Sequence, residues 1–133
     1  MSKNIVIVGA LGYLGSELCK LYSGESWFHN IVAIDNRFVS KSVNQLKDWN
    51  IKFYQGQILD ENFMKKHLND ADIVHHLAGV TDVAYVKKEA TQDHDERIRK
   101  IAIEGTNIIL HFFDIELKIL LVPSIAIFLI LSS

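Results

Sequence analysis

The feature that most constrains this chain is a set of three spaced glycines directly after a short apolar segment. Residues 4–8 read Asn-Ile-Val-Ile-Val, Gly9, Gly12 and Gly15 follow, and residues 13–23 form an amphipathic stretch. A buried strand, a tight glycine turn and a helix start make up the first unit of a dinucleotide-binding fold. The opening therefore predicts a parallel sheet that begins with such a unit.

Each glycine of this turn has a separate physical reason. Gly9 lets the chain turn sharply after the strand, and Gly15 lets the helix pack close to the sheet. Gly12 has no side chain, so backbone N–H groups can approach a pyrophosphate. The helix N-terminus adds unpaired donors and partial positive charge. Three spaced glycines are a weak signal alone, and the strand and helix around them make this signal specific.

Strand-like and helix-like segments alternate along the rest of the chain. This alternation, with right-handed crossovers, predicts an α/β, Rossmann-like, doubly wound sheet of about five parallel strands in the order 3-2-1-4-5. The expected strands cover residues 4–8, 31–35, 51–54, 72–77 and 118–122. The expected helices cover residues 13–23, 41–49, 61–68 and 89–113.

Charge and cysteine content narrow the class of protein. The net charge of −2 gives no electrostatic case for binding nucleic acid or an anionic membrane. The single cysteine, Cys19, excludes an internal disulfide and fits a reducing, cytoplasmic compartment. Because it falls within the first expected helix, Cys19 is interpreted as a packing residue. The apolar run over residues 119–131 is shorter than the roughly 20 residues that span a bilayer, so a membrane role is not expected.

An acidic residue supports the dinucleotide interpretation. Asp35 closes the second expected strand, twenty positions after Gly15. A carboxylate there can accept hydrogen bonds from the adenosine ribose and would repel a 2′-phosphate. Arg37 lies two positions further on and could accommodate such a phosphate, so it favours the opposite cofactor. We give the carboxylate more weight, and NAD is the expected cofactor.

Five segments carry a resemblance to a known family. They are the Gly9-x-x-Gly12-x-x-Gly15 turn and the segments 33–37, 54–60, 72–79 and 104–110. In this order and spacing the chain resembles the NAD-dependent epimerase/dehydratase family, a branch of the extended short-chain dehydrogenase/reductase superfamily that acts on nucleotide sugars. The resemblance implies an NAD-binding domain over residues 1–126, truncated before a substrate subdomain, and an apolar tail over residues 127–133.

The resemblance also implies a role for each matching position. The pyrophosphate would be surrounded by Gly9, Gly12, Tyr13, Leu14 and Gly15. The adenosine ribose would be held by Asp35 and Asn36, the adenine would be flanked by Gln57 and Ile58, and the path to the nicotinamide ribose would follow Leu77, Ala78 and Gly79. Ser124 would stand where the family has its catalytic Ser or Thr. No metal is expected.

Several positions depart from the family pattern. Gln57 replaces an adenine-contacting Asp, and Ala102 replaces an Asn three residues before Gly105. None of the four tyrosines has a lysine four residues further on, so the family's Tyr-x-x-x-Lys pair, in which the lysine lowers the tyrosine pKa, is absent. We therefore expect cofactor binding with little or no turnover of a nucleotide sugar by this chain.

Two other functions stay open. A non-catalytic dinucleotide-binding or interaction module would act through a specific partner surface, and a short-chain-type reductase would need the same Tyr and Lys pair. A homodimer through the long helix 89–113 is a further expectation. The tail beyond Ile127 would reflect either truncation, which we favour, or an apolar extension that packs on a partner or lies against a membrane.

Three polar groups invite a functional interpretation. Adjacent His75 and His76 point to opposite faces of a strand, which makes them poor joint ligands, so we interpret one as partly buried and the other as hydrogen-bonded. The segment 93–96 has the residue types of a metal cluster but lies in a charged stretch, so we interpret it as a solvated helix face. Asp82 follows the fourth strand, where substrate contact or a plain turn or helix cap is expected.

Overall fold

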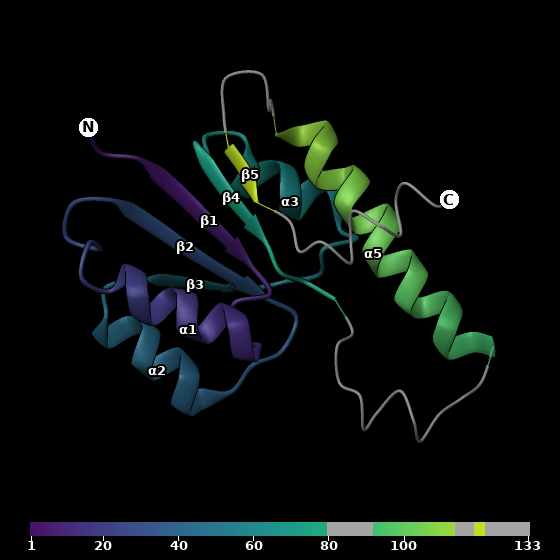
Figure 1. Cartoon of the computed structure of the whole chain (residues 1–133), viewed down its shortest axis with the longest axis horizontal. Helices are drawn as coiled ribbons and strands as arrows, with labels where there is room; N and C mark the ends of the chain where they lie inside the picture. Colours follow the sequence, from purple (N-terminus) through teal and green to yellow (C-terminus); the bar gives the residue numbers. More distant parts are fainter. Residues whose placement is uncertain (80–91, 114–118, 122–133) are drawn as a thin grey trace.

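Five parallel strands form one sheet with helices on both faces in the computed structural model of the chain (Figure 1). The structure describes residues 1–79, 92–113 and 119–121. The strands are β1 (Asn4–Val8), β2 (Asn30–Asp35), β3 (Lys52–Gln55), β4 (Ile73–His76) and β5 (Ile119–Leu121). The helices are α1 (Tyr13–Tyr22), α2 (Ser40–Asp48), α3 (Glu61–Leu68) and α5 (Gln92–Phe112).

The strand order is β3-β2-β1-β4-β5, which confirms the predicted order. The central strand β1 pairs with β2 on one side and β4 on the other, with Val8 opposite both Ile34 and His76. Chain order reverses beside β1, since β2 lies on one side of it and β4 on the other. In open parallel sheets, the crevice for a ligand lies at the carboxyl ends of the strands at this reversal.

The central strand is buried on both faces, as its continuous apolar sequence predicts. Ile5 and Ile7 belong to one core with Cys19 of α1, and Val6 and Val8 belong to a second core, formed with α3 and α5. Helices α1 and α2 accordingly lie on one face of the sheet and α3 and α5 on the other (Figure 1). Alternation along β1 thus builds both cores from one short strand.

Element bounds agree with the predicted ones to within a few residues. β1 and α3 match to the residue. β3 begins one residue later than predicted because the Ile51 N–H donates to the Leu46 carbonyl at 2.9 Å in the turn after α2, and pairing with β2 starts with Val32 opposite Lys52. Residues 89–91 of the predicted long helix lie outside the described residues, as do Ser124, Asp82 and the apolar tail.

The two histidines of β4 point to opposite faces, as predicted. His75 Nε2 lies 2.7 Å from the Tyr22 hydroxyl on the α1 side, and His76 Nε2 lies 2.7 Å from Thr106 Oγ1 on the α5 side. Burial lowers the pKa of His76 to about 4, so this side chain is neutral. Among the described residues, no group of His, Cys, Asp and Glu could hold a metal ion.

Cys19 is a packing residue, which confirms its interpretation from sequence. Its side chain is fully buried in the α1 core. Burial raises the pKa of its thiol to about 12, which keeps it protonated and unreactive.

In the part of the chain that the structure describes, no helix is long and apolar enough to cross a membrane.

Candidate dinucleotide site

A cavity of about 770 Å³ opens at the carboxyl ends of the strands. All of the residues predicted to bind the cofactor lie on its wall, although they come from four separate segments. These residues are Gly9, Gly12, Tyr13, Leu14, Gly15, Asp35, Asn36, Gln57, Ile58, Leu77, Ala78 and Gly79. The structure brings the predicted site together, and the role of each residue in binding stays a prediction.

Two glycines of the turn are required by the backbone around them. Gly9 has a φ of +86°, a conformation that favours glycine, and a Cβ there would lie 2.6 Å from the backbone nitrogen of Ala78. A Cβ on Gly15 would overlap the carbonyl oxygen of Gly9. The N–H groups of Gly9 and Ala10 both donate to the Ile34 carbonyl, at 2.8 and 3.1 Å. The turn is therefore fixed against β2 and β4.

Gly12 differs from the other two glycines. Its backbone, with φ −71° and ψ 172°, is extended and open to any residue. A Cβ there would meet nothing closer than Gly9 O at 3.5 Å and Arg37 Nη2 at 3.8 Å. Gly12 is the N-cap of α1 and makes no side-chain cap, and the first N–H groups of a helix have no partner within it. The missing side chain thus leaves a helix N-terminus open to the cavity.

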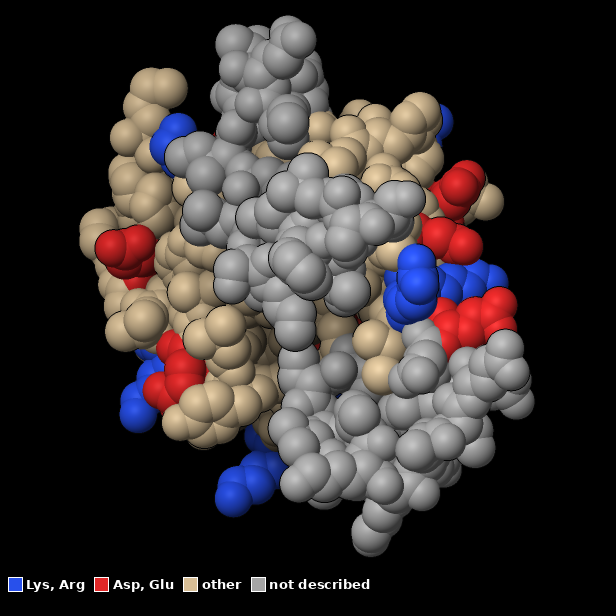
Figure 2. Space-filling model, turned by 45° about the vertical axis from the view of Figure 1, so that its right-hand side comes forward, with Lys and Arg blue, Asp and Glu red and all other residues tan. Residues whose placement is uncertain are grey.

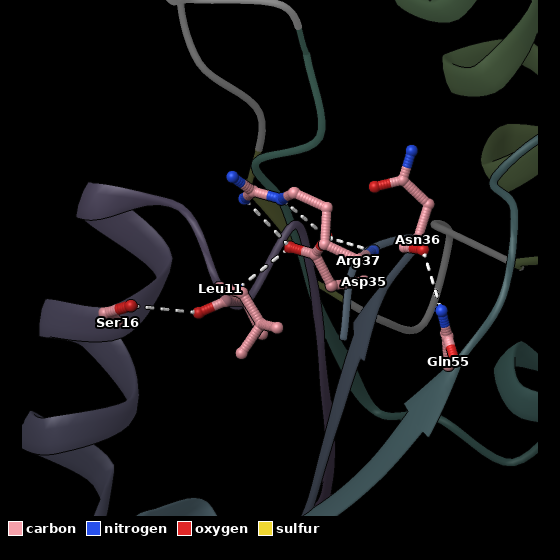
Figure 3. A network of polar contacts seen from close by, with 7 residues as sticks. Leu11, Ser16, Asp35, Asn36, Arg37 and Gln55 are labelled. Atoms are coloured by element: carbon pink, nitrogen blue, oxygen red, sulfur yellow. Dashed lines mark hydrogen bonds and ion pairs between the residues drawn. The ribbon is translucent and has the colours of Figure 1, made fainter. Parts of the chain in front are cut away.

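Asp35 is held rigidly where β2 ends. Its side chain is 4% exposed, and Oδ2 accepts from the Leu11 N–H at 2.9 Å. Oδ1 accepts from the Arg37 N–H at 3.0 Å and from Arg37 Nε at 3.2 Å, and Nη2 donates to Oδ2 at 3.3 Å. Figure 3 shows the Arg37 side chain lying over this carboxylate. Nearby, Gln55 Nε2 donates to the Asn36 carbonyl at 3.1 Å.

The loop after β3 forms the wall on the other side of Asp35. The Gly56 N–H donates to the Asp35 carbonyl at 3.0 Å, which continues the pairing of β3 with β2. Ile58 is buried and packs against α5 at Gly105, where a Cβ would lie 2.9 Å from Ile58 Cδ1. These contacts fix the loop that carries Gln57 and Ile58.

Sequence reasoning did not place α5 at this cavity. Arg97, Lys100 and Ile101 line it, together with Arg37 from the β2 end. These α5 residues share one helix face because Lys100 and Ile101 follow Arg97 by three and four positions. That spacing, with two cations on one face, is a signal that the sequence already contained. Figure 2 shows basic and acidic side chains next to each other on one side of the molecule. Within the segment 93–96 the described side chain is that of Glu96, which is exposed, and the solvated face predicted for the whole segment stays a prediction.

The chain matches the 3-beta hydroxysteroid dehydrogenase/isomerase family over residues 6–125. It is 35% identical over 89 residues to dTDP-D-glucose 4,6-dehydratase of Dictyostelium discoideum, covering 61% of this chain and 20% of that protein. It is 29% identical over 112 residues to UDP-N-acetyl-alpha-D-glucosaminuronate decarboxylase of Bacillus cytotoxicus, covering 79% of this chain and 34% of that protein. The chain thus spans about a third or less of the length of these relatives.

Solved structures of similar fold include two epimerases. The UDP-glucose 4-epimerase of Thermotoga maritima, solved with UDP-glucose, has a TM-score of 0.64 at 25% identity, covering 82% of this chain and 33% of that one. The UDP-glucose-4-epimerase of Stenotrophomonas maltophila, solved with bound NAD and formylated UDP-arabinopyranose, has a TM-score of 0.66 at 21% identity, covering 83% and 33%. At that second identity, the likeness concerns the fold.

Proposed function

Since the chain belongs to the 3-beta hydroxysteroid dehydrogenase/isomerase family, we propose that it is the cofactor-binding part of an NAD-dependent enzyme of the epimerase/dehydratase type. The substrate class we propose is a nucleotide sugar. Relatives named as a nucleotide-sugar dehydratase and decarboxylase support this class. The chain covers 20% and 34% of their lengths, so this substrate is assigned to the whole enzyme.

The observation that carries the proposal is the open backbone at Gly12. Gly9 and Gly15 are explained by crowding within the protein itself. No contact or dihedral angle among the described residues demands a glycine at position 12, yet this position faces the cavity at the start of α1. A ligand that approaches the backbone closely gives Gly12 its reason, and a pyrophosphate suits the partial positive charge of a helix N-terminus.

The rest of the cavity wall suits the other parts of a nicotinamide dinucleotide. The adenosine ribose would lie beside Asp35 and Asn36, and the adenine between Gln57 and Ile58. The path along Leu77, Ala78 and Gly79 would lead to the nicotinamide ribose. A ligand extended across the carboxyl ends of the strands in this way matches the position of the reversal in strand order.

The chemistry divides between the cofactor and the chain. A bound nicotinamide would supply hydride transfer to and from the sugar. The residues of this chain would bind and orient the cofactor. None of its tyrosines has a lysine four residues further on, so these residues lack the Tyr and Lys pair that would act as the base. We therefore propose that these residues alone bind the cofactor without converting a sugar.

Calorimetric titration with NAD⁺ tests the proposal, with Gly12→Ala as the variant. A methyl group at position 12 occupies the space proposed for the pyrophosphate, so NAD⁺ should bind at least about tenfold more weakly, a loss of about 1.4 kcal/mol. Because alanine is a poorer N-cap than glycine, the free energy of unfolding, measured in urea, should fall by about 1 kcal/mol or less.

The matched control is Gly24→Ala, since a Cβ at Gly24 meets nothing within 4 Å and this residue does not line the cavity. This control should bind NAD⁺ like the wild type. The proposal fails if folded wild-type chain does not bind NAD⁺, or if Gly12→Ala binds it unchanged.

A further inference from the structure

We propose that Arg37 makes this site accept the 2′-phosphate of NADP, so that NAD and NADP bind with similar affinity. Asp35 alone would favour NAD, because a free carboxylate repels a 2′-phosphate. The structure changes the balance between these two residues. The inference rests on the proposed function, since it places the adenosine ribose beside Asp35.

The Asp35 carboxylate already accepts hydrogen bonds on both of its oxygens. An ionised carboxylate offers about four lone-pair sites. Oδ1 accepts from the Arg37 N–H and Nε, and Oδ2 accepts from the Leu11 N–H and Arg37 Nη2. All four sites are therefore used within the protein. A ribose hydroxyl gains access to this carboxylate only when the guanidinium group moves away.

The positive charges around the cavity outweigh the charge of Asp35. Arg37 Nε and Nη2 contact the two carboxylate oxygens at 3.2 and 3.3 Å, so a positive charge directly offsets the negative one. Asp35 is the only acid among the described residues that line the cavity, while Arg37 and Lys100 also line it. An added phosphate dianion therefore meets more positive than negative charge from these three side chains, which attracts it.

Arg37 keeps N–H donors that Asp35 does not use. A guanidinium group has five N–H donors in a fixed fork, and Nε and Nη2 each direct one of them at Asp35. The side chain is 58% exposed, whereas the carboxylate below it is 4% exposed. The remaining donors thus face away from Asp35, toward solvent and the cavity. Such a fork binds phosphate oxygens in pairs.

The guanidinium group of Arg37 lies close to the start of α1. Arg37 Nη2 lies 3.8 Å from the point that a Cβ of Gly12 would occupy. The guanidinium therefore borders the same open space as the start of α1. The proposed 2′-phosphate and pyrophosphate would sit at neighbouring points of one cavity. An ion pair with one partner largely in solvent contributes little stability, so the guanidinium can swing away for NAD or stay for NADP.

The test is a pair of calorimetric titrations of the full chain, one with NAD⁺ and one with NADP⁺. The wild type should bind the two with dissociation constants within about tenfold of each other. Arg37→Ala should weaken NADP⁺ at least about tenfold and leave NAD⁺ equal or tighter, because Asp35 becomes free for the ribose. The matched control is Arg99→Ala, an exposed arginine of α5 that does not line the cavity, and it should keep the wild-type ratio.

A second variant guards against a folding defect in the first. Arg37→Lys keeps the charge without the fork and should give an NADP⁺ affinity between those of wild type and Arg37→Ala. The inference is overturned if NAD⁺ binds but the ratio of the NAD⁺ and NADP⁺ dissociation constants is the same in the wild type, Arg37→Ala and Arg37→Lys. Loss of both ligands from folded wild-type chain would instead overturn the proposed function, so the two failures are distinguishable.

Discussion

The two ends of the parallel sheet both carry a hollow, and the two hollows are built differently. The one at the carboxyl ends measures about 770 Å³, and five glycines line it. The one at the amino ends measures about 220 Å³ and is lined by described residues of β1, β2, β3 and α3 and of the turn after α3, none of them a glycine. The first residues of α1 line only the larger of the two.

Polar groups at the amino end already bind each other. Asn4 Nδ2 donates to the Asp70 carbonyl at 3.0 Å, and Asn30 Nδ2 donates to Asn4 Oδ1 at 3.1 Å. The rings of Tyr54 and His67 pack with centroids 4.4 Å apart. The amide groups of Asn4 and Asn30 are thus already used within the protein, whereas the first N–H groups of α1 have no partner within the helix. Cavity volume alone therefore does not identify the binding site. The N–H groups at the start of α1, which have no partner within the helix, identify it.

The largest expected effect comes from crowding the backbone at the carboxyl end. Gly9→Ala combines a φ of +86° with a Cβ 2.6 Å from Ala78 N, so it should destabilise the fold by about 4 kcal/mol. Urea unfolding followed by circular dichroism measures this loss. Gly24, in the turn before β2, has open space around it, and Gly24→Ala should cost about 0.5 kcal/mol or less. Equal losses for the two variants would remove the contrast.

A smaller effect separates two histidines, His76 at the carboxyl end and His67 at the amino end. Burial lowers the pKa of His76 to about 4, below the ordinary 6.5, so the unfolded chain binds more protons between these pH values. Stability should therefore fall by about 3 kcal/mol as pH drops from 6.5 to 4. The His67 pKa is also lowered, by burial and then by Lys66, but its side chain is only half-buried.

The measurement is urea unfolding at several pH values between 7.5 and 4. His76→Gln should flatten the pH dependence, whereas His67→Gln should leave most of it. Comparing slopes rather than absolute stabilities keeps the test valid where the buried substitution itself is destabilising. Parallel curves for wild type and His76→Gln would contradict the assignment.

The smallest expected effect comes from the amino-end hollow. Lys66 is exposed and lines this hollow, and Lys66→Ala should change stability by about 0.5 kcal/mol or less. NAD⁺ affinity should stay within about twofold of the wild type, because the screened charge lies at the opposite end of the strands. Urea unfolding and calorimetry measure both quantities. A tenfold loss of NAD⁺ affinity would mean that the ligand uses the wrong end of the sheet.

Much of this fold could be predicted because its signals are local. The apolar run before Gly9 identifies β1, and alternating strand and helix patterns give the order of the sheet, which the structure confirms. Alternation along β4 correctly places His75 and His76 on opposite faces. The comparisons confirm the predicted family resemblance. Local pattern also explains why strand bounds are right to within a residue or two.

The remaining features depend on contacts between distant residues. The partner of His76 is Thr106, thirty positions later, and no local pattern identifies it. Arg37 lies within two residues of Asp35, yet the sequence does not reveal that its guanidinium group occupies both carboxylate oxygens. The approach of Arg97 to the cavity likewise depends on how α5 packs against α3 and Ile58. The predicted role of Ser124 stays a prediction.

The central place of β1 has a consequence for synthesis on the ribosome. β1 leaves the exit tunnel before both of its neighbours in the sheet, β2 and β4, and Val8 pairs with Ile34 and with His76. At ordinary translation rates the second partner follows the first by on the order of seconds. During that interval one edge of an apolar strand has no neighbour from its own chain, and such edges attract strands of other chains. The nascent protein is therefore most exposed to aggregation after β2 has docked and before β4 has emerged.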